Sequence, residues 1–257
     1  MPPALPQYYS SLAPFRAVFA TGLPILTYHK LGPRPRRVRL KGLYLSARLF
    51  ERQLAELRAA GFANTDLSAV LEPTPTSAVP APRRIVITFD DGFRNVLEHG
   101  LPVLLRHGFK AIQFLVADLI GRTNEWEQRE GEAAEPLMDK AQVREWLAAG
   151  MAIGSHTRTH PWLTRLSAER AREEIAASKR LLEDRFGVAV EHFCYPYGDH
   201  NPAVCDLVAG AGYRTACTVE PGVNTAQNPP HTLRRFTARY ASRNLKAVWQ
   251  RLRRFTP

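Results

Sequence analysis

A short strand-forming run that ends in two adjacent carboxylates constrains this chain more than any other segment. The run from Ile85 to Phe89 is mostly apolar and β-branched. Asp90, Asp91 and Gly92 follow it directly. Such a run is typical of a buried strand, and the glycine favours a sharp turn after it. Because two neighbouring acids repel each other unless a cation binds one of them, the segment predicts a cation site at a strand end.

A second segment supplies the ligands that such a cation needs. The strand-like residues 151–155 lead into His156 and His160. Imidazole with carboxylate is the ligand set of catalytic zinc-type sites, and three protein ligands leave a coordination position open. Thr157 follows the first histidine, so the metalloprotease pattern with glutamate there is absent. We expect Asp91, His156 and His160 to bind one divalent metal, Zn²⁺ by preference, with Co²⁺ or Ni²⁺ as substitutes. Either motif alone also fits an ordinary turn or exposed histidines.

Strand-like and helical patterns alternate along most of the chain. Apolar runs typical of strands occur at about 24–29, 84–90, 111–117, 151–155, 191–196, 213–219 and 232–238. Helical patterns in the gaps include one that ends before Gly61, one capped by Asp139 and one from Ser167 to Gly187. This alternation indicates parallel strands with crossover helices. We expect an α/β fold, an irregular seven-stranded (β/α) barrel of the triosephosphate-isomerase (TIM) type.

Polar residues of chemical interest gather at the ends of these predicted strands. Six of them lie at or just beyond the C-terminal end of a run: His29, Asp90, Asp91, His156, Tyr197 and Arg235. In a barrel of this type the active site lies at the C-terminal strand ends. The sequence therefore predicts that these residues share one site.

The motifs resemble those of the polysaccharide deacetylases, carbohydrate esterase family four, whose catalytic unit is the NodB homology domain. Residues 88–92 and 155–160 match the two most specific motifs of that family. Looser motifs occur in the same order at 26–29, 193–198, 211–216 and 233–235, so the likeness covers nearly the whole chain. The resemblance implies a metal-dependent hydrolase that removes N-acetyl groups from an amino sugar in an oligosaccharide, a polysaccharide or a lipid-linked glycan.

The resemblance also implies roles for individual residues. Asp90, beside the metal ligand, matches the family's general base, and the backbone N–H of Tyr197 matches its oxyanion donor. Cys194 stands where many members carry the arginine that orients the base. We therefore expect that arginine to come from elsewhere in the chain, with Arg235 as the candidate and Arg234 as the alternative.

The family's late histidine, which protonates the leaving amine, is missing from this sequence. The matching segment 233–237 contains none, and His231 precedes the position. We expect His29 to act as the general acid instead. A structural histidine bonded to a neighbouring strand also fits its place.

Other functions stay open at this point. A non-catalytic glycan-binding relative would keep the fold, although it would more often have lost Asp90 or a ligand histidine. An acetyl esterase or a hydrolase of small cyclic amides would use the same site on another bond. Trp126, after the third predicted strand, can stack on a sugar or simply pack in its loop.

The chain is expected to form one domain with short additions. Its 257 residues, 45% of them hydrophobic, suffice for one large α/β core. We expect an N-terminal extension at 1–23, the catalytic domain at 24–240 and a basic helix or tail at 241–257. The proline-rich stretch 72–82 predicts a surface loop. Three cysteines without metal-ligand spacing predict free thiols.

The charge balance is basic, with a formal net charge of +11 at pH 7. Basic residues concentrate at 34–41 and 246–254, which fits solvated surface charge or attraction to an anionic membrane surface or an anionic glycan. No base-reading motif accompanies them, so nucleic acid is not an expected partner. We find no pattern of a signal peptide or of a transmembrane helix, and we expect a cytoplasmic or peripherally membrane-associated protein.

Overall fold

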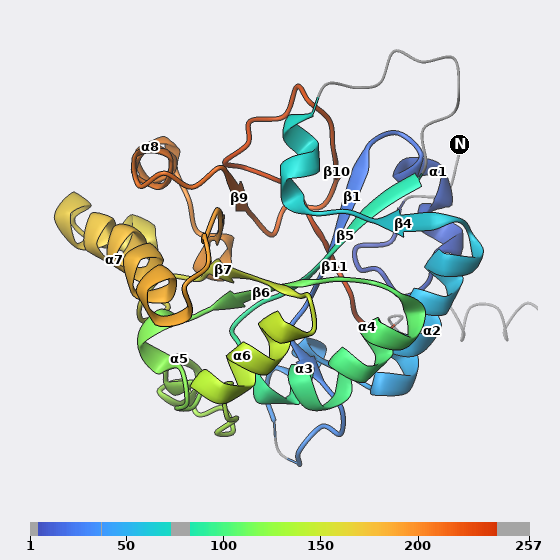
Figure 1. Cartoon of the computed structure of the whole chain (residues 1–257), viewed down its shortest axis with the longest axis horizontal. Helices are drawn as coiled ribbons and strands as arrows, with labels where there is room; N and C mark the ends of the chain where they lie inside the picture. The colour runs from blue at the N-terminus through green and yellow to red at the C-terminus, as the bar shows by residue number, and fades with distance from the viewer. Residues whose placement is uncertain (1–4, 37, 73–82, 241–257) are drawn as a thin grey trace, which may run out of the picture.

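The computed structural model describes residues 5–36, 38–72 and 83–240 (Figure 1). Residues 73–82, which form most of the predicted proline-rich loop, lie outside the described residues. The same holds for 241–257, the predicted basic helix or tail. The expectations for these two segments therefore stay predictions.

A curled sheet of mostly parallel strands forms the centre of the fold (Figure 1). Its main path runs β10–β1–β5–β6–β7–β8–β9, with β11 paired to β1 and β4 paired to β5. The strands are β1 Leu23–Tyr28, β4 Phe62–Asn64, β5 Arg83–Phe89, β6 Ile112–Leu115, β7 Ala152–Ser155, β8 His192–Cys194, β9 Thr215–Cys217, β10 Val223–Asn224 and β11 Phe236–Thr237. The short β2 Lys30–Leu31 and β3 Tyr44–Leu45 form a separate pair.

The sheet curls until its last segment returns to the first strand. Leu233 bridges to Cys217 of β9, and β11 then pairs in parallel with β1. The segment 233–237 therefore lies between β9 and β1 and closes the barrel. Each of the seven predicted runs coincides with one of these strands, so the expected irregular seven-stranded (β/α) barrel is confirmed.

Helices cover the outside of this sheet (Figure 1). The α-helices are α1 Arg16–Phe19, α2 Ala47–Ala59, α3 Arg94–His99, α4 Leu101–His107, α5 Glu125–Gln128, α6 Lys140–Ala148, α7 Ala168–Phe186 and α8 Pro202–Gly210. The 3₁₀ helices are η1 Ala13–Phe15, η2 Lys41–Leu43, η3 Leu67–Leu71, η4 Ala117–Leu119, η5 Leu163–Arg165 and η6 Pro196–Gly198. Asp139 and Gln142 form a capping box at the start of α6. Ser167 caps α7, and Gly187 ends it in a left-handed conformation. The predicted helices are thus confirmed.

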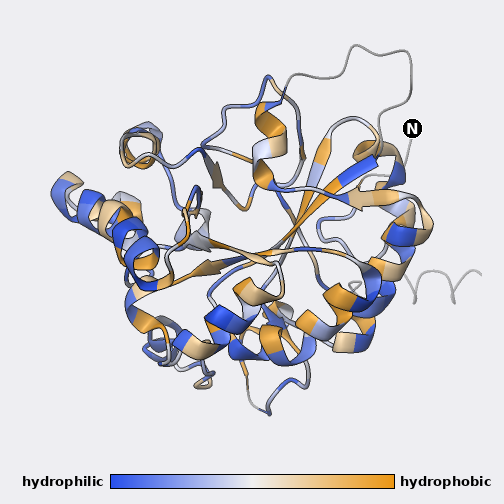
Figure 2. Ribbon diagram, in the orientation of Figure 1, coloured by the Kyte–Doolittle hydropathy of each residue, from blue (hydrophilic) through white to orange (hydrophobic). Residues whose placement is uncertain are grey.

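The core fills the space between strands and helices. Figure 2 shows apolar residues along the central strands, with hydrophilic residues on the helices around them. The N-terminal segment joins this core, because Tyr9, Phe15 and Phe19 are buried and pack against one another. Phe15 also meets Phe236 of β11 edge-on. Residues 9–19 therefore share the core of the barrel, while the domain boundary expected after residue 23 stays a prediction.

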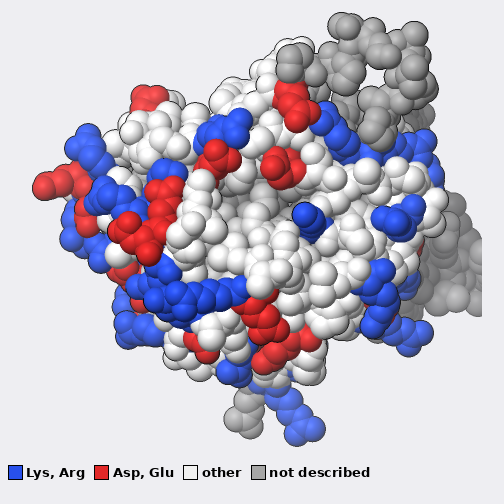
Figure 3. Space-filling view, in the orientation of Figure 1, with Lys and Arg blue, Asp and Glu red and all other residues white. Residues whose placement is uncertain are grey.

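Other sequence expectations concern thiols, the membrane and the surface. All three cysteines are free, as expected. Among the described residues, no helix combines the length and apolar character needed to cross a membrane. Figure 3 shows Asp and Glu interspersed with Lys and Arg around α7, while the middle of that face is mostly uncharged. Attraction to an anionic surface stays a prediction.

Candidate active site

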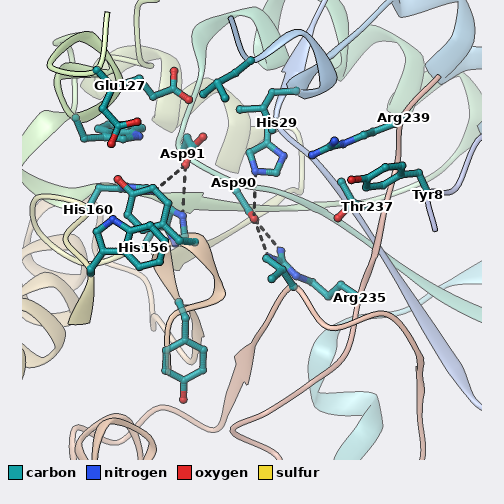
Figure 4. Close-up of a pocket in the computed structure, with 18 of the residues that line it drawn as sticks. Tyr8, His29, Asp90, Asp91, Glu127, His156, His160, Arg235, Thr237 and Arg239 are labelled. Atoms are coloured by element: carbon teal, nitrogen blue, oxygen red, sulfur yellow. Dashed lines mark hydrogen bonds and ion pairs between the residues drawn. The ribbon is translucent and has the colours of Figure 1, made fainter. Parts of the chain in front are cut away.

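One pocket of about 530 Å³ opens where the loops after the barrel strands meet. His29 follows β1, the Asp90–Asp91 pair follows β5, and His156 follows β7. Figure 4 shows these side chains converging from different strands. All seven site residues expected from the sequence line the pocket: His29, Asp90, Asp91, His156, His160, Tyr197 and Arg235.

Backbone strain among the described residues is concentrated in these loops. Only four non-glycine residues there have positive φ, and they are Asp91, Thr157, His160 and Tyr197, with φ between 59° and 78°. Such a conformation costs an L-residue of order 1–3 kcal/mol and persists only where its surroundings impose it. The strain therefore marks the loops in which tertiary contacts fix the direction of the side chains.

The loop that carries the two histidines is held by α7. Glu174 of that helix accepts hydrogen bonds from the backbone N–H groups of Arg158 and Thr159, each at 2.9 Å. Within the loop, the hydroxyl of Thr157 accepts from the N–H of His160 at 3.0 Å. These bonds satisfy backbone N–H groups of the turn, which lies outside any strand or helix and so lacks their regular hydrogen bonds. The turn brings both histidines to the same side of the pocket.

Three of the expected residues are spaced to bind one metal ion. Oδ1 of Asp91 lies 3.3 Å from Nε2 of His156 and 3.3 Å from Nε2 of His160. Two atoms bound at about 2.0 Å to one tetrahedral ion lie about 3.3 Å apart, so this spacing fits a zinc-like ion. The three side chains are buried. Their donor set and spacing both fit a divalent metal.

The two imidazole rings are held in different ways. Nδ1 of His156 lies 2.7 Å from the carbonyl oxygen of Cys194 and donates to it, so Nε2 is the ring nitrogen that faces Asp91 and could bind a metal. The ring of His160 stacks on Trp126 with a centroid distance of 4.4 Å and meets Tyr197 edge-on. Both rings are therefore oriented by the protein itself.

A second group of potential ligands is less suited to a metal. Asp90, His156 and Cys194 also bring ligand atoms within 4.8 Å of one another. However, both carboxylate oxygens of Asp90 already accept hydrogen bonds from Arg235. Burial also raises the pKa of the Cys194 thiol to about 11, so it stays protonated at neutral pH. The set with Asp91 is the better candidate.

Asp90 is held as a carboxylate by a bidentate ion pair. Nη1 of Arg235 donates to Oδ1 at 2.7 Å, and Nη2 donates to Oδ2 at 2.8 Å. Burial alone would raise the pKa of Asp90, but the guanidinium outweighs it and the pKa lies below its usual range. Each carboxylate oxygen keeps a second lone pair, so Asp90 can still accept a proton.

Arg235 reaches Asp90 from inside the barrel. It is fully buried, and it also donates to the carbonyl oxygen of Thr218 at 2.8 Å and to the sulfur of Cys194 at 3.1 Å. Arg234, the alternative, is exposed. The expected position of Arg235 at a C-terminal strand end was wrong, because it precedes β11. The strand begins later than the apolar run, and the long side chain spans the remaining distance.

In Figure 4, His29 lies beside Asp90, between Asp91 and Arg239. Its Nε2 is 3.8 Å from Oδ2 of Asp90. Burial lowers the pKa of His29, and the charges of Asp90 and Asp91 offset only part of this effect. The ring is therefore neutral at neutral pH, and its protonated form is a stronger acid than an ordinary imidazolium.

A buried ion pair that was not predicted from the sequence lies beside the site. Nζ of Lys30 lies 2.6 Å from Oε2 of Glu127, and Lys30 is fully buried beneath the ring of Phe93. Glu127 lines the pocket. The available signal was adjacency alone, since Lys30 follows His29 and Glu127 follows Trp126.

The aromatic residues of the pocket pack on other side chains. Trp126 is buried with one face on His160, so loop packing rather than open stacking is its observed arrangement. Trp162, which the sequence analysis did not single out, lies parallel to Tyr197 at 4.0 Å. The guanidinium of Arg165 lies over the same indole at 4.4 Å. These contacts stiffen the wall beside the histidines.

Comparison of the sequence with known proteins finds a matching family and individual relatives. A sequence profile described as polysaccharide deacetylase matches residues 78–216. YxkH of Bacillus subtilis (strain 168), a protein named for the polysaccharide deacetylases, is 28% identical over 214 residues, which are 83% of this chain and 70% of that protein. The peptidoglycan-N-acetylglucosamine deacetylase PgdA of Listeria monocytogenes is 27% identical over 127 residues, which are 49% of this chain and only 24% of that protein.

Comparison of the fold with solved structures also finds similar proteins. The structure of IcaB from Ammonifex degensii superposes with a TM-score of 0.73 and 24% identity, and the match covers 89% of this chain and 96% of that one. At this identity the likeness concerns the fold. It shows that the curled barrel described above recurs in a solved structure.

Proposed function

Because this chain belongs to the polysaccharide deacetylase family, we propose that it is a metal-dependent hydrolase that removes N-acetyl groups from an amino sugar in a glycan. One observation carries the proposal. Oδ1 of Asp91 lies 3.3 Å from Nε2 of both His156 and His160, in the same pocket as the Asp90–Arg235 pair. A glycan-binding relative without activity would need neither the ligand set nor a carboxylate held ready beside it.

Asp91, His156 and His160 would hold the metal ion. Carboxylate and imidazole ligands suit Zn²⁺ and also accept Co²⁺ or Ni²⁺. When bound, such an ion supplies Lewis-acid polarisation of the acetyl carbonyl and lowers the pKa of water at an open coordination position.

The chain's own groups then handle the protons and the negative charge. Asp90 accepts the proton of the attacking water, and Arg235 keeps its carboxylate ionised and fixed. The backbone N–H of Tyr197, in its left-handed turn at φ 59°, stabilises the developing oxyanion. His29, 3.8 Å from Asp90, takes up that proton and donates it to the leaving amine.

The substrate proposed is an N-acetylated amino sugar within an oligosaccharide, a polysaccharide or a lipid-linked glycan. Support comes from the family and from PgdA, whose name specifies N-acetylglucosamine in peptidoglycan. A pocket of about 530 Å³ lies in the usual range of small-ligand sites, so it has room for a sugar unit at the metal.

Acetate release from matched substrates tests this function. We expect the zinc-loaded protein to release acetate from N-acetylglucosamine oligomers and to generate one primary amine for each acetate. O-acetylated xylo-oligosaccharides serve as the comparison. Release from the O-acetyl substrate without new amines would assign an esterase instead. Release from neither substrate would reject the catalytic proposal.

Replacement of His29 by glutamine separates a general acid from a positioning group. We expect His29→Gln to slow the N-acetyl substrate by about a hundredfold or more, the usual contribution of acid–base catalysis. An activated acetyl ester, such as 4-nitrophenyl acetate, should be much less affected because its leaving group needs little protonation. The measurement is kcat/KM for both substrates with zinc content checked. Equal slowing of both would mean that His29 positions the site, and unchanged rates would remove it from the mechanism.

A further inference from the structure

The pocket extends past His29 to the guanidinium of Arg239. Arg239 lines this end together with Tyr8 and Thr237. Figure 4 shows its side chain directed toward His29. Among the described residues, no carboxylate oxygen lies within 4.0 Å of it, and its buried Nε has no hydrogen-bond partner. A buried donor left unpaired in this way is unusual in a native fold.

The pocket lining contains a second arginine, Arg235, whose charge is neutralised by Asp90. Arg235 binds both oxygens of Asp90, at 2.7 and 2.8 Å. Glu130 also lines the pocket, but it is exposed and lies farther than 4.0 Å from Arg239. The positive charge of Arg239 is therefore available to a molecule that enters the pocket.

Within the part of the chain that the structure describes, Arg239 is held in place by contacts that do not use the hydrogen-bond donors of its guanidinium. Its Cζ lies 4.1 Å from the centre of the Tyr8 ring, and its backbone N–H donates to the carbonyl oxygen of Tyr9 at 2.9 Å. A Cβ at Gly42 would lie only 2.8 Å from its Nη1, so the glycine leaves room for the guanidinium. A guanidinium fixed by stacking loses little side-chain entropy when it binds an oxyanion in its planar fork.

We propose that Arg239 binds an oxyanion of the substrate, a carboxylate or a phosphate on the group that adjoins the N-acetylated sugar. The inference rests on the proposed function and narrows its substrate class to acidic glycans. In Figure 4, Asp90 and His29 lie between Arg239 and the group of Asp91, His156 and His160. A sugar at the metal and an anion at Arg239 would therefore lie on either side of Asp90 and His29.

Two matched substrate pairs test this inference and distinguish the two sources of the oxyanion. The first pair is a disaccharide of N-acetylglucosamine and glucuronic acid, compared with the same disaccharide reduced at the carboxyl group. The second is N-acetylglucosamine 1-phosphate, compared with the methyl glycoside. We expect the zinc-loaded full chain to prefer the anionic member of at least one pair by about 10- to 100-fold in kcat/KM, the usual value of a hydrogen bond to a charged group.

Arg239→Gln should remove that preference through a higher KM for the anionic substrate, with the neutral substrate nearly unchanged. Arg234→Gln is the matched control, because it removes one positive charge from an exposed arginine outside the pocket lining. Arg239→Lys keeps the charge without the fork and should retain only part of the preference.

Equal rates for both members of each pair, or a preference that survives in Arg239→Gln, would overturn the inference while acetate release continues. If no substrate releases acetate, the proposed function fails, and calorimetry with the two anionic compounds then decides the inference. Binding of either compound that is lost in Arg239→Gln supports the oxyanion site. Binding of neither compound, or binding unchanged by the substitution, rejects it.

Discussion

His156→Ala should empty the metal site and abolish acetate release. The substitution removes one of the three proposed ligands, and Asp91 with His160 would leave the site one ligand short. We expect metal analysis of the dialysed protein to find about one zinc ion per chain in the native protein and almost none in the variant. Acetate release from N-acetylglucosamine oligomers should fall below detection, because the proposed mechanism needs the ion to polarise the carbonyl and to activate the water.

His192→Ala is the matched control for this variant. His192 is also buried, but it begins β8 and its Nδ1 lies 2.9 Å from the hydroxyl of Thr215, outside the pocket lining. The control should lose stability through a comparable cavity and keep both zinc and activity. Stoichiometric tight zinc in the His156→Ala protein would show that the ligand assignment is wrong.

Asp90→Asn should keep its zinc, lose most turnover and lose stability. Loss of a general base typically lowers kcat by about 10²–10⁴-fold. The stability effect has a separate cause, because Arg235 is fully buried and would face an amide that carries no charge. Breaking one side of a buried ion pair costs about 3–5 kcal/mol. Denaturant unfolding, zinc content and acetate release measured on the same preparation check the three parts.

Two further variants serve as comparisons for Asp90→Asn. Glu191→Gln breaks an exposed ion pair with Arg214 and should change stability by about 1 kcal/mol or less. Asp91→Asn should lose zinc and turnover together. If Asp90→Asn lost the metal while Asp91→Asn retained it, the roles of base and ligand would have to be exchanged.

The features that could be predicted from the sequence are those that depend on a few neighbouring residues. The apolar run before Asp90 and the capped helix that begins after Ser167 each carry their signal within a few residues. Because parallel strands place their C-terminal ends together, polar side chains that follow different strands could be expected to meet. His156 and Asp91 meet for this reason.

The features that escaped prediction depend on contacts between distant segments. The Lys30–Glu127 pair joins residues that no periodic pattern connects, and either side chain alone looks like ordinary surface charge. The burial of Phe15 against Phe236 is equally invisible in a linear pattern, since it joins the two ends of the described chain.

The role of Arg235 could be predicted from the sequence only in part. The family resemblance implied that an arginine orients Asp90. Because Cys194 occupies the position where many members carry that arginine, it had to come from elsewhere in the chain. Only the tertiary structure shows from which direction it contacts Asp90. In the structure the guanidinium lies 3.1 Å from the sulfur of Cys194 and binds Asp90 from the barrel interior. We interpret this as an exchange in which a small side chain on β8 leaves space for a long one that precedes β11.

Titration of zinc into metal-free protein tests whether acetate release depends on one metal ion at Asp91, His156 and His160. Acetate release from N-acetylglucosamine oligomers is measured as zinc is added to protein stripped with a chelator and dialysed. The proposed metal dependence predicts no release at the start, a rise in proportion to added zinc and a plateau at about one zinc ion per chain, with no rise in Asp91→Asn. Acetate release at the full rate by the stripped protein, unchanged by added zinc, would contradict it.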